Sequence, residues 1–460
     1  MAFRQEDSGL DAIFVVSSQP RGEGRLAFTR RFAAFAVMLV CLACAKPAPP
    51  RADRPWTPAE RAILASLTPI PVPPPSSGNR VADDPVAVHL GQALFFDTGL
   101  SANGKVACAT CHQPERWFTD GLPLARGIAQ AGRNAPTLLG IQWLPYLFHD
   151  GRKDSLWSQA TGPLEADVEH GYDRLALAHR IARHYRAPYE TLFGPLPPLD
   201  DLTRFPPHAR PVPFQSSHPH HVAWLAMTEA DRIAVNTLLA NFGKVLEAYE
   251  RKLLPQEAPF DRYARKLLAN DPTAVQEISP AAQRGLRAFI GRAQCVNCHN
   301  GPLFTDKAFH NLALPPIAGQ TSLDVGRSLG AQSVKADEFR CGSIYSDTQH
   351  CQELRFLNPR FADFLGAFKT PTLRNVARTA PYMHTGQFAT LNDVLTFYRT
   401  LPGQARVGHR ELVLTLLDAD VNQADLLAFL ETLTGPLPDG QWLHPPQPIP
   451  PPDAVTGVAP

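Results

Sequence analysis

Residues 108–112 read CATCH and residues 295–299 read CVNCH, so the chain contains the pattern C-x-x-C-H twice. This pattern is the attachment motif of c-type haem, in which two thiols bind the porphyrin covalently and the adjoining histidine binds the iron. Paired C-x-x-C units also occur in zinc ribbons, but zinc does not require a histidine after each second cysteine, and these two units lie far apart in the chain. The sequence therefore predicts two covalent haems. The residues that would hold them are Cys108, Cys111, His112, Cys295, Cys298 and His299.

Helical patterns surround both motifs. Asp84 predicts the start of a helix that continues to residue 96, and Ser279 predicts the start of another that leads into the second motif. Apolar residues at three- and four-residue steps predict two further helices, over residues 228–254 and 422–433. Strand-like alternation is nearly absent. We therefore expect a mainly α fold of two cytochrome c-like haem domains with long loops and little β structure. We expect no close internal repeat beyond the two motifs and the helix before each.

The overall charge excludes some classes of partner. The chain has 460 residues with 44 basic and 43 acidic side chains, which gives a formal net charge of +1. This length has room for two or three domains. A charge this close to zero provides no electrostatic drive toward nucleic acid or toward an anionic membrane surface. We therefore expect no nucleic-acid partner.

The N-terminal region contains the only hydrophobic run, residues 32–44 (FAAFAVMLVCLAC), directly after two arginines. The run is shorter than the roughly 20 residues of a membrane-spanning helix, whereas a basic flank with a short apolar core is typical of an export signal. We therefore predict an export signal over residues 1–44 and a periplasmic protein. Lipidation of Cys44 stays open, because Cys41 stands where lipoprotein signals usually have leucine. Such a lipid anchor is the only membrane contact that we expect.

Proline accounts for 46 residues, about twice the average usage. Proline-rich stretches resist packing and are typical of linkers and surface loops. They occur over residues 46–55, 69–75, 195–213 and 436–460. The predicted organisation after the signal is therefore a Pro-rich linker over 45–80, an N-terminal haem domain over 81–275, a C-terminal haem domain over 276–435 and a Pro-rich tail over 436–460.

Two cysteines outside the haem motifs, Cys341 and Cys351, lie ten positions apart in a polar segment. In an oxidising compartment they most simply close a small disulfide loop. A redox role is the alternative.

The two irons are expected to differ in their sixth ligand. A haem with a free face can bind peroxide, whereas a haem with two strong protein ligands transfers electrons. The sequence has no His or Met between His112 and His149, so the first iron is predicted to be open. For the second iron, Met383 and Tyr398 are candidates. Tyr398 lies on the inward face of a helix that Thr390 caps, where a tyrosine is most often part of the core, so the residues alone leave the ligand undecided.

Beyond the haem motifs, residues 81–435 resemble the bacterial di-haem cytochrome c peroxidase family, and within it the MauG-like branch. The resemblance rests on residues 94–97 (LFFD), 132–137 (GRNAPT), 150–152 (DGR), 159–163 (QATGP), 369–376 (KTPTLRNV) and 379–382 (TAPY). It implies that the N-terminal haem reacts with peroxide and that the C-terminal haem stores or relays an electron. The loop over residues 113–133 lacks the His that the better-known branch places on the first iron. The resemblance also implies Tyr398, rather than Met383, as the ligand of the second iron.

The same resemblance implies further site residues. Glu169 matches the catalytic acid that moves the peroxide proton, while Gln159 and Pro163 match positions of the distal pocket. A calcium ion between the haems would be held by the Asn134 side chain and by the backbone carbonyls of Thr379 and Pro381.

One residue departs from the family. Where the family commonly has Trp between the haems, this chain has His149, and imidazole is a much poorer relay for an oxidising equivalent. Trp117, Trp143 or Trp157 would then have to substitute. His149 itself is expected either to have a structural polar role or to ligate near an iron. Three further histidines are expected to hydrogen-bond to haem propionates or to the backbone, namely His170, His310 and His384.

The expected function is that of an exported di-haem c-type peroxidase, which reduces hydrogen peroxide with electrons from an external donor. That donor would be a small cytochrome c, a cupredoxin, or a side chain on a partner protein as in MauG-like maturation. A non-enzymatic di-haem electron-transfer cytochrome or redox sensor is the alternative. It predicts two six-coordinate haems and no response to peroxide.

Overall fold

The helices around the first motif pack at a glycine. In the computed structural model, which describes residues 54–76, 78–317 and 323–446, α2 (Pro85–Phe95) crosses α9 (Glu229–Glu250). A Cβ added to Gly91 would lie 1.8 Å from the Val245 carbonyl oxygen, so only glycine allows this approach. The side chains of Phe95, Phe118 and Tyr249 then stack around the crossing, with the Phe95 and Tyr249 ring centroids 5.0 Å apart. This crossing is the centre of the N-terminal core.

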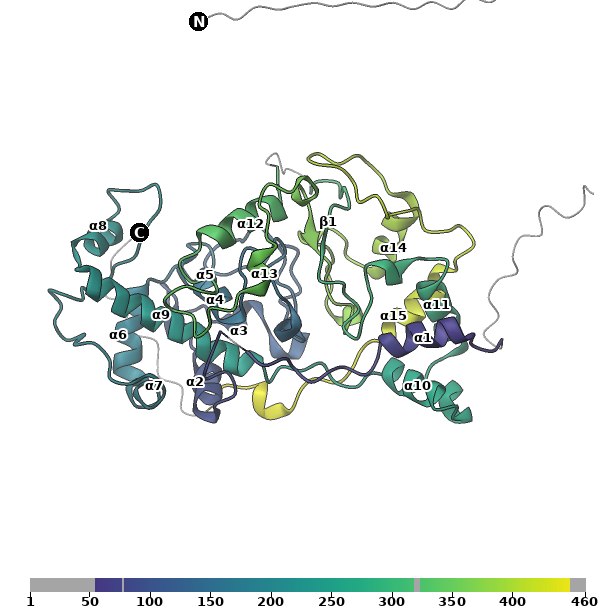
Figure 1. Cartoon of the computed structure of the whole chain (residues 1–460), viewed down its shortest axis with the longest axis horizontal. Helices are drawn as coiled ribbons and strands as arrows, with labels where there is room; N and C mark the ends of the chain where they lie inside the picture. Colours follow the sequence, from purple (N-terminus) through teal and green to yellow (C-terminus); the bar gives the residue numbers. More distant parts are fainter. Residues whose placement is uncertain (1–53, 77, 318–322, 447–460) are drawn as a thin grey trace, which may run out of the picture. The chain divides into compact units, whose positions relative to one another are not determined.

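The helices around the second motif repeat the same arrangement. Helix α11 (Pro280–Ile290) crosses α15 (Gln423–Glu431), and the two ribbons lie against each other in Figure 1. A Cβ added to Gly285 would lie 1.9 Å from the Asp425 carbonyl oxygen. Phe289 packs on Phe304 and Phe429, with ring centroids 5.9 and 5.0 Å apart. The two halves therefore share a partner helix and an aromatic cluster as well as the motif and the helix before it, which agrees with the expectation of two related haem domains.

The remaining secondary structure confirms a mainly α fold. Strands β1 (Phe309–His310) and β2 (Phe368–Lys369) pair antiparallel in a two-stranded sheet. The other helices are α1 (Pro58–Ser66), α3 (Cys108–Cys111), α4 (Leu156–Gln159), α5 (Thr161–Glu165), α6 (Arg174–His184), α7 (Arg186–Phe193), α8 (Pro219–Ala226), α10 (Pro259–Leu268), α12 (Arg327–Ala336), α13 (Gln352–Arg355) and α14 (Leu391–Thr400). Within the described ranges, none of these helices is long and apolar enough to span a membrane.

Four helices begin at the residues where the sequence predicts them to begin. Asp84, Thr228, Ser279 and Asn422 each accept a backbone N–H at the first turn of α2, α9, α11 and α15. The end of α9 was predicted four residues too late. After Arg251 the turn tightens, because the Lys252 and Leu253 N–H groups bond three residues back, to the carbonyl oxygens of Tyr249 and Glu250.

Part of the segment predicted as a linker, residues 45–80, packs instead. Helix α1 has a capping box formed by Thr57 and Glu60, and it buries Leu64 and Leu67 completely in the core around α11. The proline-rich composition misled the prediction because the apolar residues of α1 lie between two proline stretches. The predicted domain boundaries otherwise stay predictions, and the export signal and Cys44 lie outside the described residues.

The start of the predicted tail, residues 436–460, contacts the N-terminal helices. The Tyr249 hydroxyl donates to the Trp442 carbonyl oxygen at 2.6 Å. The Gln92 amide donates to the carbonyl oxygens of Gln441 and His444. Residues 441–444 are thus held on α2 and α9, and residues 447–460 lie outside the described part of the chain.

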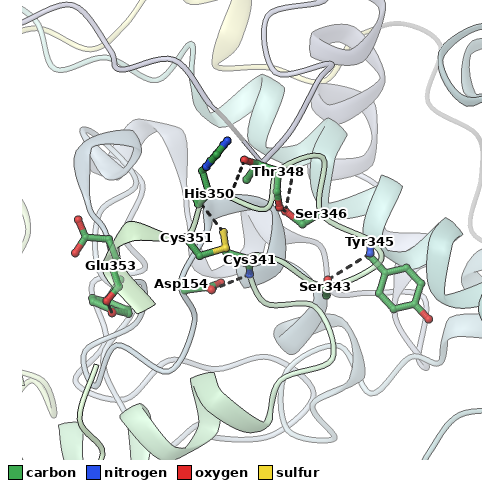
Figure 2. Close-up of a disulfide and its surroundings, with 10 residues drawn as sticks. Asp154, Cys341, Ser343, Tyr345, Ser346, Thr348, His350, Cys351 and Glu353 are labelled. Carbon is green, nitrogen blue, oxygen red and sulfur yellow. Dashed lines mark hydrogen bonds between the residues drawn. A yellow bond between two sulfur atoms is a disulfide. The ribbon is translucent and has the colours of Figure 1, made fainter. Parts of the chain in front are cut away.

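Cys341 and Cys351 form the expected disulfide (Figure 2). The Cys341 backbone N–H donates to the Asp154 carboxylate at 2.8 Å. Ion pairs tie this region to two helices, since Asp347 within the loop pairs with Lys244 in α9, and Glu338, three residues before the loop, pairs with Arg174 at the start of α6. The disulfide therefore closes a loop that braces the N-terminal core.

Candidate functional site

The histidine of the first C-x-x-C-H motif directly follows α3 and is held by a hydrogen bond. Cys108 and Cys111 begin and end this short helix, and His112 follows as its C-cap. The His112 Nδ1–H donates to the Phe118 carbonyl oxygen at 3.1 Å, because a carbonyl can only accept. This bond leaves Nε2 as the ring nitrogen with a free lone pair, the form in which imidazole binds a metal.

The second motif repeats this geometry. Cys295 lies in a short 3₁₀ turn (Cys295–Asn297), and the His299 Nδ1–H donates to the Phe304 carbonyl oxygen at 3.0 Å. Phe118 and Phe304 are both fully buried and both have positive φ angles, 59° and 53°. Each histidine therefore has its tautomer and orientation fixed by the same kind of turn.

A threonine holds each of these turns. The Thr137 hydroxyl donates to the Trp117 carbonyl oxygen, and the Thr372 hydroxyl donates to the Leu303 carbonyl oxygen, both at 2.6 Å. Both threonines stand in the sequence Pro-Thr-Leu, at residues 136–138 and 371–373. Sequence reasoning missed this repeat, although the shared tripeptide was a visible signal.

The donor set at both motifs fits c-type haem. The four motif cysteines are free thiols, whereas Cys341 and Cys351 are paired. A cavity of about 390 Å³ is lined by Cys295, Cys298 and His299, together with many apolar side chains. A largely apolar cavity with two thiols and one available imidazole nitrogen suits a covalently attached porphyrin.

Glu169 lies beside the first motif. Burial raises the pKa of the Glu169 carboxyl, and only the more distant charge of Arg152 opposes this rise. Burial also raises the pKa of the Cys111 thiol to about 12, with the Asp120 and Glu169 carboxylates adding to the effect. The Glu169 backbone is held by a hydrogen bond from its N–H to the Ala166 carbonyl oxygen. A carboxyl group with a raised pKa near the cofactor is suited to exchange protons with a substrate.

Gln159 and Pro163, the other predicted distal residues, lie on consecutive short helices. Gln159 ends α4, and Pro163 lies in α5. The Pro163 carbonyl oxygen accepts the His170 N–H, which brings α5 and the residue after Glu169 into one turn. Helix α4 approaches α9 closely, since a Cβ on Gly243 would lie 2.0 Å from the Trp157 carbonyl oxygen.

The second motif has a phenol as its neighbour. Tyr398 lies on α14 and lines the same cavity as His299. Burial raises the pKa of the Tyr398 hydroxyl, and negative charge on Cys295 and Cys298 would raise it further, so the phenol lies within electrostatic range of both thiols. Met383 lines this cavity as well. The structure thus brings both candidate ligands to the second motif.

Asn134, Thr379 and Pro381, the predicted calcium ligands, also line this cavity. The Asn134 amide nitrogen donates to the Leu122 carbonyl oxygen at 2.7 Å, so the side-chain oxygen is the atom left for a cation. Amide and carbonyl oxygens are the donors that calcium prefers, and the residues therefore fit the ion.

The two halves exchange a reciprocal pair of backbone hydrogen bonds. The Lys369 N–H donates to the His149 carbonyl oxygen at 2.8 Å, and the Asn134 N–H donates to the His384 carbonyl oxygen at 3.0 Å. His149 and His384 occupy equivalent turns, because each directly follows a residue of positive φ, Phe148 or Met383, and precedes a glycine of positive φ by two residues. The similarity between the two halves therefore also includes the turns at His149 and His384.

The His149 ring has the structural role that was one of its two expected outcomes. Its Nε2–H donates to the Asn134 carbonyl oxygen at 3.0 Å. Burial lowers the pKa of His149 to about 3, with His384 as the next cause, so the ring is neutral. His384 stacks on the Phe368 ring, with centroids 3.6 Å apart.

Two of the other expected histidine contacts can be compared directly. His170 donates from Nδ1 to the Leu100 carbonyl oxygen at 2.7 Å, which confirms the backbone contact. His310 instead contacts two carboxylates, with Asp306 at 2.8 Å from Nε2 and Glu411 at 2.7 Å from Nδ1, in place of a backbone contact, and a contact with a haem propionate stays a prediction. These contacts raise the pKa of His310 to about 9, chiefly through Asp306.

Two buried carboxyl groups near the first motif were missed. Glu247 and Glu250 are buried in α9, and each has one side-chain oxygen that has no hydrogen-bond partner in the described part of the chain. Burial raises the pKa of Glu250 to about 8, and Glu247 adds to this rise. Glu250 is also, after burial, the largest cause that raises the pKa of Cys108. The sequence did contain a signal for their burial, because both residues lie close to the apolar Leu246 on α9.

Among the tryptophans considered as relays, Trp117 contacts the other half of the chain. Its Nε1–H donates to the Gly435 carbonyl oxygen at 3.4 Å, and the Arg378 guanidinium lies 5.5 Å from its ring centroid. Trp143 and Trp157 are buried in the N-terminal half.

Comparisons with known proteins agree with this geometry. A family model described as di-haem cytochrome c peroxidase matches residues 85–268. The cytochrome-c peroxidase IdrP1 of Denitromonas iodatirespirans is 30% identical over 412 residues, which cover 87% of this chain and 92% of that protein. The methylamine utilization protein MauG of Methylophilus methylotrophus is 31% identical over 352 residues, 75% of this chain and 82% of that protein. The solved structure of the diheme peroxidase BthA from Burkholderia thailandensis E264 has a TM-score of 0.55 at 24% identity, over 82% of this chain and 90% of that chain.

Proposed function

The chain belongs to the di-haem cytochrome c peroxidase family, and on this premise we propose that it reduces hydrogen peroxide to water with electrons from an external donor. One observation carries the proposal. In both C-x-x-C-H motifs the histidine donates to the carbonyl oxygen of a buried phenylalanine, but the first motif has the Glu169 carboxyl group beside it and the second has the Tyr398 phenol. Two similar motifs with different neighbouring side chains support different roles for the two haems.

Each haem would be held by its two cysteines and by the Nε2 of its histidine. When bound, the haems supply iron centres that exchange electrons with the oxidant and with the donor. The hydrogen bonds from His112 and His299 to carbonyl oxygens keep Nδ1 protonated, which fixes the ring orientation and raises the basicity of Nε2.

Glu169 would handle the proton. Its carboxylate accepts a proton from one oxygen of peroxide and returns it to the other oxygen, which then leaves as water. The full reaction takes up two electrons from the donor and two protons from solvent, and it yields two water molecules. Burial supports this role, because it raises the pKa of Glu169 toward the pH at which the group must both take up and release a proton.

Tyr398 would close the second haem through its phenolic oxygen. An oxygen ligand favours the more oxidised states of iron, whereas the Met383 thioether would favour the reduced state. The nearness of Tyr398 to both motif cysteines supports this assignment. A calcium ion would be held by Asn134, Thr379 and Pro381.

The donor would be a small redox protein or a side chain of a partner protein. Leu412, Val413 and Leu416 are exposed by 84%, 56% and 59%, and Val413 also lines the cavity of the second motif. This apolar loop supports docking of the donor beside the second haem. The disulfide and the haem motifs support a periplasmic location.

The proposal is tested with the full-length protein carrying both haems. A reduced small cytochrome c is mixed with the protein, and its oxidation is followed after peroxide is added. Catalytic oxidation of two cytochromes per peroxide is the expected result. If the protein exchanges electrons with the cytochrome but does not consume peroxide, it is an electron carrier and the proposal is wrong.

A further inference from the structure

A histidine-rich segment folds onto the start of α6, outside both haem motifs. Residues 218–221 read HPHH and begin α8, and His208 lies in the proline-rich stretch before them. The N-cap of α6 is Asp173. One oxygen of Asp173 and one ring nitrogen each of His208 and His220 lie within 4.8 Å of one another.

The Asp173 carboxylate is fixed in place. Its Oδ1 accepts the N–H groups of Leu175, Ala176 and Ala209. Its Oδ2 is 2.7 Å from the His208 Nδ1, and the residue is only 3% exposed. Three backbone donors hold one oxygen, so the second oxygen is aimed at the histidines without further rearrangement.

A ring nitrogen of His220 lies close to the same Asp173 carboxylate and to His208. The rings of His208 and His220 stack with centroids 5.4 Å apart and planes 9° apart. The His220 Nδ1 is buried and has no hydrogen-bond partner among the described residues. A buried ring nitrogen that has no hydrogen-bond partner is available to bind a metal ion.

We propose that Asp173, His208 and His220 bind a divalent transition-metal ion of the zinc class. Two imidazole nitrogens and one carboxylate oxygen form a ligand set typical of zinc, with the fourth position of the tetrahedron left to water. Ligand distances of about 2.0–2.2 Å require the ligand atoms to lie roughly 3–3.5 Å apart. His208 must therefore move slightly away from Asp173, which its half-exposed position in a loop permits.

The ion would join three separate segments of the chain. His208 belongs to the proline-rich loop, His220 to α8 and Asp173 to the start of α6. Asp173 also follows Glu169 by four residues. Metal binding would thus hold the proline-rich loop against the segment that connects Glu169 to α6. The inference does not depend on the haem chemistry.

The test uses the full-length protein carrying both haems, stripped of loosely bound metals and kept in excess calcium. Zinc chloride is added in an isothermal titration, and retained zinc is measured after dialysis. One zinc per chain with micromolar or tighter affinity is the expected result for the wild type. His208→Ala and His220→Ala should each weaken binding at least tenfold.

A matched control separates this site from ordinary surface histidines. His409 contacts the Asp363 carboxylate at 2.8 Å but belongs to no three-residue group of candidate ligands among the described residues, so His409→Ala should bind zinc like the wild type. Zinc should also slow amide hydrogen exchange over residues 205–222 and leave residues 407–411 unchanged. The proposal is overturned if the wild type binds no zinc at micromolar concentrations, if all three variants bind equally, or if the exchange of residues 205–222 does not respond.

Discussion

The side chains beside the two haem motifs differ, although both motifs orient their histidine by the same kind of hydrogen bond. Glu169 beside the first motif has a raised pKa from burial, and its task in the proposed reaction is proton transfer. Glu169→Gln should slow the reaction with peroxide by about 10²–10⁴-fold, because the amide cannot accept the proton, while haem content stays unchanged. Stopped-flow absorbance after one equivalent of peroxide measures this rate. Glu115→Gln changes an exposed carboxylate near the same motif and serves as the control. An unchanged rate in Glu169→Gln would exclude its proton role.

Tyr398 is the corresponding residue at the second motif. Tyr398→Phe removes the phenolic oxygen and should change the absorption and magnetic spectra of the second haem only. Met383→Leu is the paired variant, because both side chains line the same cavity, and it should leave both spectra as they are. The opposite pattern, in which only Met383→Leu alters the second haem, would make the thioether the ligand.

His310 makes stability depend on pH near the second motif. Asp306 and Glu411 raise its pKa to about 9, against 6.5 for an ordinary histidine. A raised pKa means that the contribution to stability is fully present below about pH 6.5 and is lost as the pH rises through about 9. The free energy of unfolding should therefore fall by about 3 kcal/mol more in the wild type than in His310→Gln between about pH 6 and pH 10.

Urea unfolding at a series of pH values, followed by circular dichroism, measures this difference. His409→Gln removes an exposed histidine–carboxylate pair and should change the pH dependence little, because solvent screens that pair. Parallel pH profiles for the wild type and His310→Gln would show that the Asp306 and Glu411 contacts do not hold the proton.

Among the secondary-structure elements, the crossing of α11 and α15 positions the second motif. Gly285→Ala places a Cβ 1.9 Å from the Asp425 carbonyl oxygen, so the helices must separate. Alanine normally stabilises a helix relative to glycine, yet here the variant should lose about 1–3 kcal/mol of unfolding free energy through overpacking. Gly132→Ala, where a Cβ meets nothing within 4 Å, is the control in the same urea titration. Equal stability of the two variants would contradict the close crossing.

The helices that pack around the two haem motifs could be predicted from sequence because their caps and apolar spacing are local. Asp84 and Ser279 cap α2 and α11 as expected, and the helices expected over residues 228–254 and 422–433 begin at the caps Thr228 and Asn422. Helix α1 was missed because its burial depends on partners far along the chain, such as Arg287, which pairs with Glu60. Local composition carries no information about such partners.

The candidate site was predictable to a similar extent. The haem motifs and Glu169 follow from sequence patterns and from a family resemblance. The two carboxylates around His310 could not be inferred, because Glu411 reaches it only through the tertiary fold. The nearness of Glu250 to Cys108 was also missed. The sequence places Glu250 on α9, but nothing near it in the sequence shows that its charge acts on Cys108.

At the level of the whole molecule, the two halves are related by repeated turns that bond to each other. Lys369 and Asn134 donate to the carbonyl oxygens of His149 and His384 in a reciprocal manner. His149 thereby gains a structural role where relatives are expected to have a tryptophan relay. Trp117 contacts Gly435 and Arg378 and is the tryptophan placed to connect the halves, and its role as a relay stays a prediction.

The proposed function depends on an asymmetry between two similar haem sites, in which the first iron would be open and the second would be closed by Tyr398. Electron paramagnetic resonance of the fully oxidised protein at low temperature tests this most directly. We predict one high-spin and one low-spin ferric signal, with the high-spin signal lost after one equivalent of peroxide. Two low-spin signals that do not change with peroxide would contradict the account.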